Sequence, residues 1–129
     1  MVHWHLLAVC LLSFTIADTH AMCNMLSDNL DEARIQLSRA ATEKDLDFAR
    51  IYASRAQGAL DDLAYSAMDC RCSMAHSGFD GSSTRTRRAR DAGSPRQFSE
   101  ELNHAVTDFN AGLDALRACA AQGTVKRPS

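Results

Sequence analysis

The sequence predicts an all-α protein: a small up-down helical bundle of four helices, the third one weak, with disulfide staples at one end. Three observations support this prediction. The chain is rich in alanine and has only two prolines and six glycines. Its apolar residues recur in alternating steps of three and four, and its cysteines lie near predicted helix ends. The 6% aromatic content argues against a β-sandwich or barrel, which needs aromatic and β-branched strands.

The N-terminal segment has the pattern of a signal peptide. Residues 6–17 form an apolar run that fits a signal-peptide core and is shorter than the ~20 residues that span a bilayer. Small residues follow, and we expect cleavage after Ala21. The expected division is a signal peptide at 1–21, a bundle domain at 22–122 and a flexible tail at 123–129. The mature protein is thus expected to be exported, periplasmic or secreted, with no stable membrane span.

Two heptad runs predict the first two helices, because steps of three and four place apolar side chains on one face. Thr42 and the acidic residues after it predict an N-cap and first turn for the second helix. Four larger residues beside the second run, Phe48, Ile51, Tyr52 and Tyr65, are expected to widen its apolar face. The seam positions are Cys23, Leu26, Leu30, Ala33, Leu37 and Ala40, and then Leu46, Ala49, Ala53, Ala56, Leu60, Leu63, Ala67 and Cys70.

The last helix has the clearest start. Ser94 is a predicted N-cap, Pro95 occupies the first helical position, and Gln97 completes a capping box. Gly123 is the expected stop. The apolar seam of this helix consists of Phe98, Leu102, Ala105, Phe109, Gly112, Leu116 and Cys119.

The stretch between Cys72 and Gly93 is less regular. Gly78 and Gly81 each disfavour a helix interior by about 1 kcal/mol relative to Ala. The sequence therefore predicts a partly frayed helix from Ser82 to Ala92 after an irregular lead-in. The alternative is a three-helix protein in which residues 73–94 form a long crossover loop. A degraded seam runs through Ala75, Phe79, Ser82, Thr86 and Ala89.

Cysteine usage favours two disulfides. Removal of the signal peptide would remove Cys10 and leave an even number, as expected for a small exported chain. In an up-down bundle the remaining four lie at one end. A bond between neighbours two residues apart is strained, so each cysteine of the Cys-Arg-Cys run is expected to bond to one of the other two, with the pairing open. The four disulfide cysteines are Cys23, Cys70, Cys72 and Cys119.

The same cysteine run supports a second interpretation. Cys70, Cys72, Met74 and His76 supply soft sulfur and imidazole ligands, which suit copper or zinc. An oxidising compartment favours disulfides instead, so the first interpretation includes no metal and no cofactor.

A basic run lies near the end of the weak third stretch and consists of Arg85, Arg87, Arg88 and Arg90. These residues are candidates for binding an anionic partner, and the alternative is a solvated face. Export, a net charge of −2 and the lack of interleaved aromatics disfavour nucleic acid.

No nucleophile, acid–base pair or phosphate-binding loop stands out, so we expect no enzymatic activity. The sequence predicts a small exported helical protein that binds another protein, as an inhibitor, immunity protein or accessory subunit. The alternative function is soft-metal binding at the Cys-Met-His run. A third is self-association into a homo-oligomer through exposed apolar residues such as Ile35, Ile51 and Tyr65.

Overall fold

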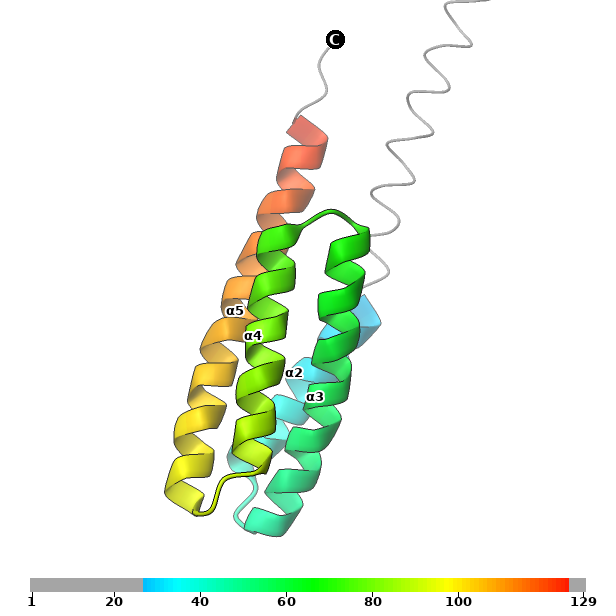
Figure 1. Ribbon diagram of the computed structural model, residues 1–129. Helices are drawn as coiled ribbons and strands as arrows, with labels where there is room; N and C mark the ends of the chain where they lie inside the picture. The colour runs from blue at the N-terminus through cyan, green and yellow to red at the C-terminus, as the bar shows by residue number, and fades with distance from the viewer. Residues whose placement is uncertain (1–26, 126–129) are drawn as a thin grey trace, which may run out of the picture.

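The computed structural model describes residues 27–125, which form four helices in an up-down-up-down arrangement (Figure 1). No strand occurs in this part of the chain, so the predicted all-α fold and helix number are confirmed. The expected signal peptide and Cys23 lie outside the described residues. The helices are α2 (Ser27–Thr42), α3 (Leu46–Asp69), α4 (Ser73–Arg90) and α5 (Pro95–Val125).

The core forms where the predicted seams face one another. Within the described residues, every predicted seam position is buried or packs against the core. Many of these residues are alanines, which let neighbouring helices approach closely. The larger residues beside the seam of α3 behave differently. Only Tyr52 packs partly against the core, whereas Phe48, Ile51 and Tyr65 are exposed and do not widen the apolar face as predicted.

The N-cap of α3 is Asp45, three residues later than the sequence predicts. The Asp45 carboxylate accepts hydrogen bonds from the backbone N–H groups of Asp47 at 2.9 Å and Phe48 at 3.3 Å. Thr42 is instead the last residue of α2, and its hydroxyl donates to the carbonyl of Ser38 at 3.0 Å. The threonine is therefore bound to the preceding helix and leaves the capping role to the aspartate.

The Asp45 cap provides a direct test of this boundary. We expect Asp45→Ala to lower the free energy of unfolding by about 1 kcal/mol, since two helical N–H groups lose their acceptor. Urea denaturation followed by circular dichroism measures the change. Asp45→Asn is the control, because an asparagine side chain keeps an acceptor oxygen at the cap. Equal losses in the two variants would contradict the capping role.

Helix α4 is longer and more regular than predicted. It begins at Ser73 rather than Ser82 and continues through both glycines to Arg90, so residues 73–94 are not a crossover loop. A Cβ atom built on Gly78 would lie 2.6 Å from the Cα of Gly112 on α5. The glycine thus permits close approach of two helices, and the packing it allows offsets its poor helix propensity.

Helix α5 begins as predicted and ends later. Ser94 Oγ accepts a hydrogen bond from the N–H of Gln97 at 3.2 Å, and Gln97 Oε1 accepts one from the N–H of Gly93 at 3.3 Å. The helix continues through Gly123 to Val125, so Gly123 is not its stop. In Figure 1, α5 extends beyond the turn that joins α3 to α4.

The turn between α3 and α4 fixes the position of Cys72. The N–H of Cys72 donates to the carbonyl of Ala67 at 2.9 Å, and the N–H of Arg71 donates to Met68 at 3.0 Å. This pair of bonds is a Schellman motif, which needs a left-handed residue, and Arg71 supplies it with φ of 61°. The turn buries the Cys72 side chain, which bonds to Cys119 of α5.

The Cys72–Cys119 bond confirms that Cys72 pairs with one of the distant cysteines, and it staples one end of the bundle. Cys70 is also disulfide-bonded. The sequence leaves Cys23 and Cys119 open as partners for Cys70, and Cys119 is bonded to Cys72. Cys23 lies outside the described residues, so a Cys23–Cys70 bond stays a prediction.

Candidate functional site

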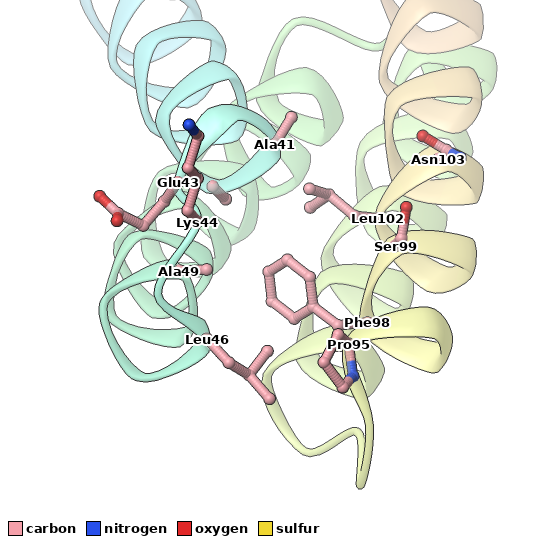
Figure 2. A pocket seen from close by; sticks show the side chains of 11 residues that line it. Ala41, Glu43, Lys44, Leu46, Ala49, Pro95, Phe98, Ser99, Leu102 and Asn103 are labelled. Carbon is pink, nitrogen blue, oxygen red and sulfur yellow. The ribbon is translucent and has the colours of Figure 1, made fainter.

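One side of the bundle is only partly closed. Helix α2 packs on α3, α3 on α4 and α4 on α5, whereas α2 and α5 touch at few points. A hollow of about 170 Å³ lies between them. It sits at the end of the bundle where α2 turns into α3 and where α5 begins (Figure 2). This hollow is a concave feature of the described residues that could receive a ligand.

The hollow has an apolar floor and a polar rim. Phe98 and Leu102 extend into it from α5, and Leu46 lies across from them at the start of α3 (Figure 2). The two helix starts explain this convergence, since Ser94 and Asp45 fix the first turns that carry Phe98 and Leu46. The rim consists of Glu43 and Lys44 on one side and Ser99 and Asn103 on the other.

The size of the hollow limits what it can hold. Pockets for drug-sized ligands usually measure about 300–1,000 Å³. A cavity of about 150 Å³ is large enough for benzene. At about 170 Å³, this hollow fits one large apolar side chain rather than a cofactor.

The arginines of the basic run do not form one surface. Arg85 points to α5 and forms an ion pair with Glu101 at 3.3 Å. Arg90 points to α3 and donates a hydrogen bond to Gln57 at 2.8 Å. The side chains of Arg87 and Arg88 are exposed. Only these two of the four predicted partner-binding residues are therefore available to a partner without breaking a contact inside the bundle.

Arg90 also contacts Asp91, with 3.0 Å between its Nε and the carboxylate. This hydrogen bond lowers the pKa of Asp91 below its usual value, and the charges of Arg90, Arg87 and Arg50 add to the effect. A lowered folded-state pKa contributes stability above the unfolded pKa, and the contribution is lost as pH falls through the folded pKa. Since the Asp91 side chain is 64% exposed, solvent screens the interaction and the effect on stability is small.

The predicted soft-metal residues are differently arranged. Cys72 and Cys70 are disulfide-bonded, so neither carries a thiolate that could bind a metal. Met74 is 74% exposed. The Nδ1–H of His76 donates to the carbonyl of Ala64 at 2.7 Å, which ties the imidazole to α3. Among the described residues, no three His, Cys, Asp or Glu side chains come together as a metal site would need.

Several polar contacts inside the bundle are not evident from the sequence. Ser82 donates to the carbonyl of Ala105 at 2.7 Å, and Ser83 donates to the carboxylate of Asp61. Arg50 donates to the carbonyl of Ala92 at 2.6 Å and so ties the start of α3 to the α4–α5 connection. The only sequence signal for the serines is their place at or beside the weak seam of α4. These contacts position helices and bring no reactive groups together.

Comparison with known proteins identifies no relative. No protein-family model, curated protein or solved structure matches this chain. Within residues 27–125, no helix combines the length and apolar character that crossing a membrane requires.

Proposed function

We propose that this chain is a small exported, non-catalytic protein that binds a helical segment of another protein in the hollow between α2 and α5. The observation that carries the proposal is the hollow itself, which opens where the fourth side of the bundle is incomplete. Its partner would act in the envelope or extracellular space, where the chain would serve as an inhibitor, immunity protein or accessory subunit.

The shape and chemistry of the hollow favour a helix with one large apolar anchor residue. Its two walls are themselves helices, and an amphipathic helix laid along such walls can insert a Leu or Phe between them. The floor of Leu46, Phe98 and Leu102 would surround that side chain. Lys44 on the rim offers a positive charge to an acidic residue beside the anchor, whereas the Glu43 carboxylate accepts a hydrogen bond from the N–H of Asp45 at 3.1 Å.

The disulfide supports the exported location. Bonds such as Cys72–Cys119 form and persist in oxidising compartments and are rare in the cytosol. A measured intact mass that matches a mature chain beginning at Met22 would provide direct evidence for export.

The hollow can be filled without changing the core. Ala41 is exposed and lines the hollow, so we expect Ala41→Trp to occupy it and to weaken partner binding by about tenfold or more. The measurement is capture from the protein's own envelope or medium by the tagged, oxidised chain, quantified by mass spectrometry, followed by titration of the purified partner.

Ala111→Trp is the matched control, since Ala111 is exposed on α5 and does not line the hollow. Equal retention of the partner by both tryptophan variants would contradict binding at the hollow. Replacing Arg87 and Arg88 together by Ser forms a separate arm of the same assay. Loss of the partner in that arm alone would place binding on the exposed arginines instead.

A further inference from the structure

The outward face of α3 carries an unusual set of exposed side chains. Phe48 is 56% exposed, Ile51 47% and Tyr65 72%. They belong to a second row with alternating steps of three and four on the side of α3 away from its buried seam. We call this row the outer α3 stripe, and all its members are exposed. It consists of Phe48, Ile51, Arg55, Gly58, Asp62, Tyr65 and Asp69.

Gly58 lies at the centre of this stripe and has no role in the packing of its own bundle. A Cβ atom built on Gly58 would meet nothing within 4 Å. Glycine weakens a helix interior, and at Gly78 the close approach of α5 offsets that cost. No such compensation exists around Gly58. An exposed glycine in the middle of a 24-residue helix leaves room for the close approach of an outside helix.

The inner part of the stripe, from Ile51 to Tyr65, is complementary to itself when reversed, whereas its two ends, Phe48 and Asp69, lie far from the crossing. If two α3 helices cross antiparallel at Gly58, Ile51 of each copy lies opposite Tyr65 of the other, and Arg55 lies opposite Asp62. Each of these pairs occurs twice, as two-fold symmetry demands. Arg55 places its guanidinium carbon 5.9 Å from the centroid of the Tyr52 ring, and neither Arg55 nor Asp62 forms an ion pair among the described residues of its own chain. A second copy would supply an ion-pair partner to both.

We propose that the outer α3 stripe binds a second copy of this chain and forms an antiparallel homodimer with Gly58 at the helix crossing. One helix from each copy makes a contact at the low end of interface sizes, so the dimer should dissociate in the micromolar range. The stripe lies away from the seam that contributes Leu46 and Ala49 to the hollow, so dimerisation leaves the hollow open. The two proposals are therefore independent.

Sedimentation equilibrium of the oxidised chain between about 1 and 300 µM tests the dimer. We expect a reversible monomer–dimer equilibrium that Ile51→Glu weakens by about tenfold or more, because a carboxylate would face the apolar part of Tyr65. Ile35→Glu is the matched control, since Ile35 is 45% exposed on the neighbouring helix and lies outside the stripe. A monomer throughout this range, or equal weakening by both variants, would overturn the proposal.

A charge exchange tests the antiparallel register. Arg55→Asp places like charges opposite each other and should weaken the dimer, whereas Arg55→Asp combined with Asp62→Arg should restore it. Gly58→Ala should raise the melting temperature of the monomer and weaken the dimer, two effects of opposite sign on stability and association. If the double variant stays as weak as Arg55→Asp alone, the register is wrong and the proposal fails. Circular dichroism checks that each variant is folded.

Discussion

Removal of the Cys72–Cys119 bond by replacing both residues with Ala is expected to lower the free energy of unfolding by about 4 kcal/mol. The bond joins residues 47 positions apart, and closing a loop of this length removes about that much chain entropy from the unfolded state. The loss is large relative to the 5–15 kcal/mol that stabilises a typical domain. The bond should supply a large fraction of the stability of this protein, because alanine-rich seams bury little apolar area per residue.

The slope of the urea transition distinguishes this mechanism from lost packing. Cys72 is buried, so its replacement also removes some contact area. A constraint on the unfolded chain limits the surface exposed on unfolding, and its removal should increase the m-value. The single variant Cys119→Ala provides a comparison, since it breaks the same bond but keeps the Cys72 side chain. A loss below about 1 kcal/mol in both variants, with m unchanged, would contradict this role for the bond.

The sequence predicts the seams of α2, α3 and α5 because their buried positions hold apolar residues at helical spacing. This signal is local and needs no knowledge of neighbouring helices. In α4 the seam includes Ser82 and Thr86, both fully buried. Thr86 donates to the carbonyl of Ser82 at 2.7 Å, and Ser82 donates to α5, so their hydroxyls satisfy the requirement that buried polar groups be paired. A hydropathy pattern counts these residues as polar, so the sequence predicts a shorter helix than the one observed.

The candidate site depends on relations between helices that spacing does not contain. Leu46 and Phe98 line the hollow only because α2 and α5 fail to close against each other. The arginine run shows that residues close in sequence need not lie close together on the surface. Successive helical residues differ by about 100° in direction, so four arginines close in sequence point to α5, to α3 and to solvent. The four arginines are therefore close together in the sequence but do not share one face of α4.

The second large effect is expected where α4 and α5 touch. We expect Gly78→Ala to destabilise the protein by about 2 kcal/mol, because the new Cβ would lie 2.6 Å from backbone atoms of Gly112. A side chain could rotate away, but two backbones can separate only by opening the interface. Gly112→Ala should also destabilise the protein, since its Cβ would lie 2.7 Å from the ring of Phe79, which is fully buried and has little room to move.

The other helical glycines supply controls in the same measurement. Gly58→Ala meets open space and should stabilise the monomer by about 1 kcal/mol through helix propensity alone. Gly81→Ala meets the flexible carboxylate of Asp108 at 3.2 Å, which can move, so a small effect is expected. One chemical change thus has opposite signs at Gly58 and Gly78. If Gly78→Ala also stabilised the protein, α4 and α5 could not approach as closely as described, and the explanation for a continuous α4 would fail with it.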